Sequence, residues 1–281
     1  MDVCRVTFLG VLLGLTVWGG CGPVITMPTP GTPPRPEEHE QPVRVRVTIA
    51  PPASEPSPVA ACQKPSPSPA SVPRTEGLPL ATRLGMFTSE QCLAELDRLG
   101  VPYRREEPHS GIATPIRLTG PVGGVLYVGQ GRDPDSTPFT LLDCRMALTL
   151  VEFSKILRKH GVVKVTHYSM YRPNHRGKPA GSGGRTGHRG GLAIDVATFQ
   201  LEDGSTVSVL KDFAGKRRAP VCGPKASPGS TPHARLLRSI VCEADDQRLF
   251  HVVLTPNHDR AHRNHFHLEV RPDGTRWFLL R

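Results

Sequence analysis

The sequence predicts an α+β domain over residues 78–281, built from a mostly antiparallel sheet with helices packed on it. Short segments with alternating apolar residues indicate strands, and three longer segments with an apolar face indicate helices. Strands and helices do not alternate strictly along the chain, which argues against an all-parallel sheet. The 281 residues include 30 prolines, which are most frequent before residue 78, so we expect a disordered N-terminal segment before the domain.

Residues 1–20 have the pattern of a secretory signal peptide. Arg5 precedes a mostly apolar run over residues 6–18, which is shorter than a membrane span of ~20 residues but fits the core of a signal. The glycine pair before Cys21 resembles a bacterial lipobox, so we expect a lipoprotein-type signal and lipidation of Cys21. The sequence therefore predicts an exported protein, anchored to a membrane by lipid and facing the periplasm or the cell surface.

Residues 21–77 are rich in proline, serine, alanine and threonine. Such a composition cannot bury enough apolar surface to offset the entropy lost on ordering. We expect this segment to be a disordered, semi-extended linker between the lipid anchor and the domain.

Three helices are expected in the domain. Thr88 and Gln91 form a capping-box pattern that opens a helix ending at Gly100. Residues 142–160 and 233–244 each carry apolar residues at helical spacing.

Strands are expected where short apolar segments lie between glycine, proline and polar turns. These segments are residues 116–118, 125–128, 162–169, 192–196, 206–210, 250–254, 265–270 and 277–280. A polar, glycine-dense loop over residues 174–185 and an irregular stretch over residues 211–232 separate some of them. A loop of that kind in a compact domain is usually functional or mobile.

Four cysteines belong to the domain, and four cysteines allow three pairings. We favour Cys92–Cys144, which would tie the first two helices together, and Cys222–Cys242, which would pin the irregular stretch to the last helix. Disulfides agree with export. A cysteine zinc site is disfavoured because the chain has no CxxC motif.

The formal net charge of +10 is compatible with an anionic polymer as partner, or with arginines scattered over a solvated surface. The chain has only nine Phe, four Tyr and two Trp, and no basic run interleaved with aromatic residues. Nucleic acid is therefore not an expected partner.

Two motifs carry the candidate chemistry. In the first, His188 and Asp195 lie seven residues apart across a glycine-rich bend, with Asp195 on a predicted strand. In the second, His265, His267 and Glu269 share one face of a strand, and apolar residues occupy the other face. Imidazole nitrogen and carboxylate oxygen suit zinc, and three protein ligands leave a fourth position for water. A lone His-x-His is more often structural, but a carboxylate in an apolar strand needs a partner or a metal.

The stretch from Thr186 to Asp195 and the closing Asn-His-Phe-His-Leu-Glu resemble signatures of the D-alanyl-D-alanine metallopeptidase and hedgehog superfamily. The second motif is most similar to the extensin-like C-terminal branch of that superfamily. The resemblance implies a hedgehog/DD-peptidase-like fold over roughly residues 80–281. It also implies that His188, Asp195 and His267 bind zinc and that His265 lies beside the metal-bound water.

Other site residues follow partly from this resemblance. Related peptidases have Tyr-Arg just after a strand, which makes Arg172 the candidate for stabilising an oxyanion, although it could also be a surface arginine. Peptidase branches of the superfamily carry a catalytic glutamate where this chain has Asn264, and asparagine cannot accept a proton. The base would then be His265 or His262, although His262 could also be an ordinary loop residue. Glu269 is expected in a structural salt bridge.

The sequence is compatible with two functions. One is a zinc metallopeptidase that cuts bacterial cell-wall (peptidoglycan) peptides, of the endopeptidase or carboxypeptidase class. The alternative is a zinc-stabilised module that binds cell-wall polymer or a protein without cleavage. Asn264 favours the module, whereas the presence of His265 and Arg172 favours the peptidase.

Overall fold

A computed structural model describes residues 77–131, 133–173 and 186–281. The expected signal peptide, Cys21, the linker up to residue 76 and the loop at residues 174–185 lie outside the described residues. Within the described ranges, the helices are too short or too polar to cross a membrane.

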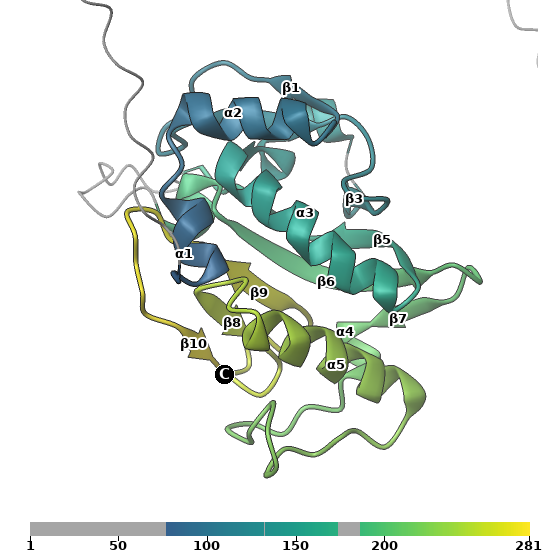
Figure 1. The fold of residues 1–281 in the computed structure, drawn as a ribbon. Helices are drawn as coiled ribbons and strands as arrows, with labels where there is room; N and C mark the ends of the chain where they lie inside the picture. Colours follow the sequence, from purple (N-terminus) through teal and green to yellow (C-terminus); the bar gives the residue numbers. More distant parts are fainter. Residues whose placement is uncertain (1–76, 132, 174–185) are drawn as a thin grey trace, which may run out of the picture. The chain divides into compact units, whose positions relative to one another are not determined.

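The described residues form an α+β domain, as predicted (Figure 1). Its main sheet has seven strands, six of them in the order β10-β8-β9-β6-β5-β3, and β7 pairs with β6. The strands are β3 (Leu126–Gly129), β5 (Val162–His167), β6 (Ala193–Leu201), β7 (Thr206–Ser208), β8 (Val252–Leu254), β9 (Phe266–Glu269) and β10 (Leu279–Leu280). A smaller sheet contains β1 (Tyr103–Arg105), β2 (Pro115–Leu118) and β4 (Leu142–Asp143).

The pairings are mostly antiparallel, in agreement with the sequence. Among the strands of the described residues, only the β3–β5 and β8–β10 pairs are parallel. Helix α3 (Cys144–Lys159) lies between β3 and β5 in the chain, because parallel neighbouring strands need a crossover connection.

The described residues contain five α-helices; in Figure 1, α3 lies in front of β5 and β6, and α5 lies beside α3 and α4. The helices are α1 (Leu80–Gly85), α2 (Ser89–Arg98), α3 (Cys144–Lys159), α4 (Val209–Asp212) and α5 (Pro232–Asp246), with short 3-10 turns η1 (Pro134–Ser136), η2 (Pro138–Thr140) and η3 (Gly187–Gly190). The capping box at Thr88 is present, since Thr88 Oγ1 accepts from the Gln91 amide. Phe153 from α3 and Phe250 pack edge to face in the core at 5.3 Å between ring centroids.

Some boundaries differ from the sequence-based expectation. The segment predicted as a strand at residues 206–210 leaves the sheet after Ser208 and turns into α4, where the Ser208 amide donates to the Asp212 carboxylate at 2.7 Å. β6 continues to Leu201 instead of ending at residue 196, because its second half pairs with β7. α1 and β1 were not predicted, since both are too short to show a periodic pattern.

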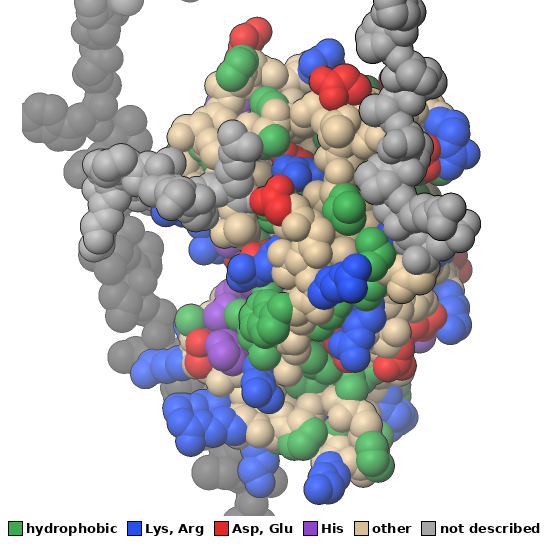
Figure 2. Space-filling view, turned by 60° about the vertical axis from the view of Figure 1, so that its left-hand side comes forward, with side chains coloured by type: hydrophobic (Ala, Val, Ile, Leu, Met, Phe, Trp, Pro, Cys, Tyr) green, Lys and Arg blue, Asp and Glu red, His purple; other side chains and the backbone are tan. Residues whose placement is uncertain are grey.

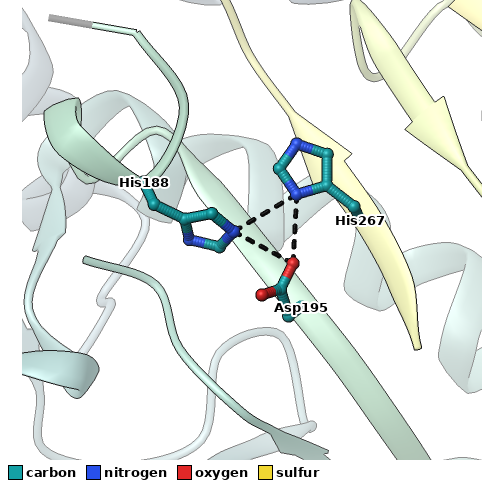
Figure 3. Close-up of side chains that lie close together, drawn as sticks. All are labelled: His188, Asp195 and His267. Atoms are coloured by element: carbon teal, nitrogen blue, oxygen red, sulfur yellow. Dashed lines mark hydrogen bonds and ion pairs between the residues drawn. The ribbon is translucent and has the colours of Figure 1, made fainter. Parts of the chain in front are cut away.

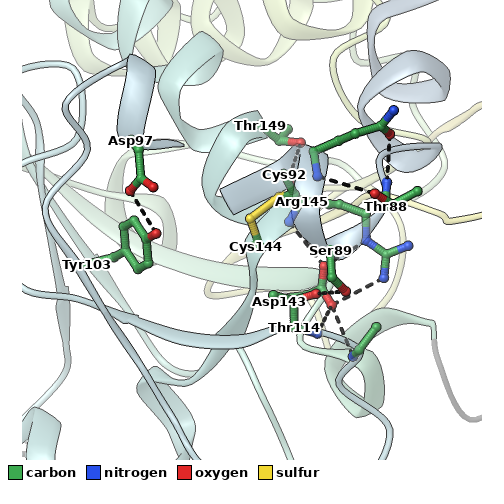
Figure 4. The surroundings of a disulfide bond; sticks show 12 residues. Thr88, Ser89, Cys92, Asp97, Tyr103, Thr114, Asp143, Cys144, Arg145 and Thr149 are labelled. Atoms are coloured by element: carbon green, nitrogen blue, oxygen red, sulfur yellow. Dashed lines mark hydrogen bonds and ion pairs between the residues drawn. A yellow bond between two sulfur atoms is a disulfide. The ribbon is translucent and has the colours of Figure 1, made fainter. Parts of the chain in front are cut away.

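Both predicted disulfides are confirmed, with Cα–Cα distances of 6.0 Å for Cys92–Cys144 and 5.6 Å for Cys222–Cys242. The first links α2 to the start of α3, beside the buried Asp143 (Figure 4). Asp143 caps α3 through the Arg145 amide and also accepts from the amides of Ala113 and Thr114. The disulfide thus ties the N-terminus of α3 to α2, and the Asp143 carboxylate ties it to the segment just before β2.

Candidate metal centre

Strands β6 and β9 place two of the predicted ligands side by side. They run antiparallel, with Asp195 directly opposite His267 and Ala193 opposite Glu269. Residues that face each other across a strand pair point to the same side of the sheet. The alternate residues Ile194 and Leu268 point to the other side and are fully buried in the core. The strand alternation predicted from the sequence therefore sends the polar side chains away from the helices and toward a common point.

The third predicted ligand, His188, comes from the 3-10 turn η3 just before β6. Gly191 ends this turn with a φ of 64°, in the left-handed region that favours glycine. A Cβ at Gly191 would lie 2.8 Å from the Asp143 amide nitrogen, so a side chain here would push against the backbone. The glycine-rich bend thus lets the turn pack closely on β4 and hold His188 over the sheet.

The three side chains meet at one point (Figure 3). His188 Nε2 lies 2.9 Å from Asp195 Oδ1 and 3.2 Å from His267 Nδ1. His267 Nδ1 lies 3.0 Å from Asp195 Oδ1. These atoms form a nearly equilateral triangle that is largely shielded from solvent, since the side chains of Asp195, His188 and His267 are 1%, 11% and 13% exposed.

This triangle fits the donor geometry of a zinc ion. Ligand atoms at ~2.1 Å from a tetrahedral zinc lie ~3.4 Å from one another, close to the spacing between these three atoms. Two imidazole nitrogens and one carboxylate oxygen are also the donor types that zinc accepts. His267 presents Nδ1 to the ion position and His188 presents Nε2, and the sequence alone does not reveal which nitrogen each histidine would use.

Each of the three side chains has an outer partner that fixes its orientation. His188 Nδ1 lies 3.1 Å from the Met170 carbonyl oxygen, which suits donation by an Nδ1–H. His267 Nε2 lies 3.3 Å from the Glu269 carboxylate. Partners of this kind orient the ring so that its other nitrogen can bind a metal in place of a proton, and they raise the basicity of that nitrogen.

Asp195 is held through its second oxygen. The Ser169 hydroxyl donates to Asp195 Oδ2 at 3.3 Å, and the Arg172 guanidinium also donates to this oxygen. Arg172 Nε donates to Ser169 Oγ at 2.9 Å. Asp195 Oδ1 therefore remains directed at the two histidines.

The electrostatics of the centre favour an ionised aspartate. Burial acts to raise the pKa of Asp195, but hydrogen bonds from His188 and His267 outweigh it and hold the pKa well below its usual range. Burial acts to lower the pKa of His267, but hydrogen bonds to the carboxylates of Asp195 and Glu269 outweigh it and raise the pKa to about 9. A carboxylate with this much attraction for positive charge is a natural cation ligand.

His265 lies beside the triangle. Its Nε2 is 3.4 Å from Asp195 Oδ1, and its Nδ1 is 3.0 Å from Asn264 Oδ1. Asn264 in turn donates to the Tyr168 hydroxyl at 3.1 Å. Burial lowers the pKa of His265 to about 4, so its imidazole is neutral near pH 7.

The remaining predicted residues also surround this point. His262 Nδ1 lies 2.8 Å from Asp259 Oδ1, and the His262 ring lies 5.1 Å from that of His265. Arg172 is 48% exposed but is anchored on Asp195, so it is not an isolated surface arginine. Glu269 pairs with Arg271 at 3.2 Å, in agreement with the expected salt bridge, and in addition contacts His267.

Four contributors were not predicted: the hydroxyls of Tyr168 and Ser169, the Met170 carbonyl and the contact of Glu269 with His267. The first three lie directly after β5, in the segment that leads to Arg172. Glu269 could have been found from its position two residues after His267 on the same strand face. No sequence pattern singles out a backbone carbonyl.

Comparisons with known proteins identify the family. The profile of the family described as extensin-like protein C-terminus matches residues 90–278, about two thirds of the chain and nearly all of the described domain. No significant match is found among curated proteins or solved structures. The chain belongs to the family of extensin-like protein C-termini.

Proposed function

We propose that this protein is an exported zinc-dependent peptidase that cuts bacterial cell-wall peptides. We also propose that it has a hedgehog/DD-peptidase-like fold and belongs to the D-alanyl-D-alanine metallopeptidase and hedgehog superfamily. The observation that carries the proposal is the convergence of His188 Nε2, Asp195 Oδ1 and His267 Nδ1 within 2.9–3.2 Å of one another. Zinc held there would lower the pKa of a bound water toward neutrality and polarise a peptide carbonyl.

His265 is the residue placed to handle a proton. Its Nε2 faces Asp195 Oδ1 at 3.4 Å, and the Asn264 side chain fixes its ring through Nδ1. If Nδ1 donates to Asn264, Nε2 carries the lone pair and can accept a proton from a water in the centre. Arg172 supplies a positive charge on the opposite oxygen of Asp195, where it can stabilise negative charge that develops on a substrate carbonyl.

Export and lipid anchoring are part of the proposal and rest on residues 1–21. We expect the full chain, produced in a bacterium with labelled fatty acid, to carry the label and to fractionate with membranes. Cys21→Ser should lose the label while keeping the domain folded. Unlabelled wild-type protein in the soluble cytoplasmic fraction would contradict export and lipidation.

The main experiment incubates the purified, zinc-loaded full chain with peptidoglycan digests and follows new peptide termini by mass spectrometry. We expect new termini, and we expect His265→Ala to lower the rate by about 10²- to 10⁴-fold, the usual contribution of a general base, while zinc content is unchanged. His233→Ala, on the exposed start of α5, is the matched control and should behave like the wild type.

A second candidate is a zinc-stabilised module that binds cell-wall polymer or a protein without cleaving it. Two observations favour it. Asn264 cannot act as a base and is engaged with Tyr168 and His265, and a His265 with a pKa of about 4 is a weaker proton acceptor than an ordinary imidazole. Zinc-dependent binding to cell wall with no new termini would identify the module and overturn the peptidase.

A further inference from the structure

The loop between β8 and β9 carries a second group of metal-binding side chains. One nitrogen from each of His258 and His262 and one carboxylate oxygen of Asp259 lie within 4.8 Å of one another. His258 Nε2 is 3.4 Å from Asp259 Oδ2, and His262 Nδ1 is 2.8 Å from Asp259 Oδ1. The two rings are 5.2 Å apart between centroids and meet nearly edge to face. These donors do not belong to the triangle of His188, Asp195 and His267.

Asp259 is held in place by its own loop. Its Oδ1 accepts from the amides of Ala261 and His262 at 2.8 and 3.1 Å, as well as from the His262 ring. Oδ2 is directed toward His258. The carboxylate is thus positioned before any ion binds. Oδ1 accepts hydrogen bonds from the loop, and Oδ2 is available to bind a metal.

The group is reachable from solvent. The side chains of His258, Asp259 and His262 are 35%, 44% and 18% exposed. Figure 2 shows histidine side chains at the surface among acidic and basic ones. His258 and Asp259 also line a cavity of about 610 Å³. Arg217, Arg218 and Arg281 line the same cavity, and their charge opposes a cation there.

We propose that His258, Asp259 and His262 form a second, weaker zinc site next to the first. Two imidazoles and one carboxylate favour zinc-like transition ions over Mg²⁺ and Ca²⁺, which prefer oxygen ligands. The greater exposure of its side chains and the nearby arginines make this site weaker than the buried one.

The second site is coupled to the first through His262. Its ring lies 5.1 Å from the His265 ring and 5.9 Å from the His267 ring, centroid to centroid. An ion at the second site would fix the orientation of His262, and with it the wall of the first centre next to His265. This role does not depend on the protein being a peptidase.

The test uses the full chain, stripped of metal and titrated with Zn²⁺ by calorimetry, with bound zinc measured after dialysis. The wild type should bind about two equivalents, the weaker one insensitive to excess Mg²⁺. His188→Ala should lose the tight equivalent and keep the weak one, and His258→Ala should do the reverse. Weak binding that persists unchanged in His258→Ala, or a His188→Ala chain that binds no zinc, would overturn the proposal.

Asp259→Asn provides a second variant in case His258→Ala disturbs the loop. The asparagine keeps an Oδ1 acceptor for the amides of Ala261 and His262 but removes the charge and the second carboxylate oxygen. We expect it to weaken the second equivalent at least tenfold and to leave the first unchanged, with an unaltered near-ultraviolet circular dichroism spectrum. Since zinc content is measured without any substrate, failure of this proposal is distinguishable from absence of peptidase activity.

Discussion

Replacing Gly191 with alanine should destabilise both the fold and the metal centre. The new Cβ would lie 2.8 Å from the Asp143 amide nitrogen and 3.1 and 3.2 Å from the Leu142 carbonyl carbon and Cα. All three are backbone atoms, so no side-chain rotation can relieve the contact. The φ of 64° adds a left-handed penalty of ~1–2 kcal/mol for a residue with a Cβ, and overpacking adds ~1–3 kcal/mol. We expect a total loss of ~2–5 kcal/mol in the free energy of unfolding.

Gly204→Ala separates the two contributions. Gly204 has a φ of 84°, but a Cβ there would meet no atom within 4 Å. This control should therefore lose only the ~1–2 kcal/mol of the left-handed penalty. Urea unfolding gives the free energies, and calorimetry gives the zinc affinity, which should fall in Gly191→Ala because the turn carrying His188 is displaced. Equal stability losses in the two variants would refute the steric reasoning.

Three further predictions follow from other parts of the structure. Glu269→Gln should weaken zinc binding by about 10- to 100-fold in calorimetry, because the partner of His267 loses its charge. The control is Glu243→Gln, which removes a carboxylate paired with Lys159 and should bind zinc like the wild type. Burial lowers the pKa of His167 from 6.5 to about 4, so its contribution to stability is complete above pH 6.5 and is lost as the pH falls toward 4. Chemical unfolding should show that the free energy of unfolding falls by up to ~3 kcal/mol between pH 7 and 4. This fall should be smaller in His167→Gln and the same as in the wild type in the exposed His233→Gln. Removing Cys92–Cys144 by a double Cys→Ala change should lower the free energy of unfolding by ~4 kcal/mol, because the cysteines are 52 residues apart. The same change at Cys222–Cys242, with a separation of 20 residues, should lower it by ~3 kcal/mol. A larger loss for the second pair would contradict the loop-entropy argument.

Local sequence patterns predicted those helices whose start and length depend on residues close to one another in the chain. The capping box at Thr88 begins α2, and the apolar face of residues 142–160 forms α3 with its boundaries shifted by a residue or two. The helical conformation of residues 209 and 210 could not be predicted in this way. Val209 and Leu210 are apolar and suit a strand, but the Asp212 carboxylate accepts from the Ser208 amide and a helical turn follows.

Longer-range features required the tertiary structure. The parallel β3–β5 pair depends on how the chain returns after α3, and no local pattern encodes that path. Arg172 was expected to face a substrate, but its position relative to Asp195 depends on how the end of β5 lies against β6. The choice of Nδ1 on His267 depends in the same way on where the Glu269 carboxylate lies.

The sequence by itself determined the chemistry of the candidate centre: two imidazoles and a carboxylate, each on an element whose alternation or glycine content directs it away from the core. Residue type and period are local properties, so they can be read from the chain. The tertiary structure alone decided that Asp195 lies opposite His267 and that His188 reaches both, because strand register and loop closure depend on contacts between residues 72 to 79 positions apart. It also decided the outer partners, which depend on distances of a few ångströms between separate segments.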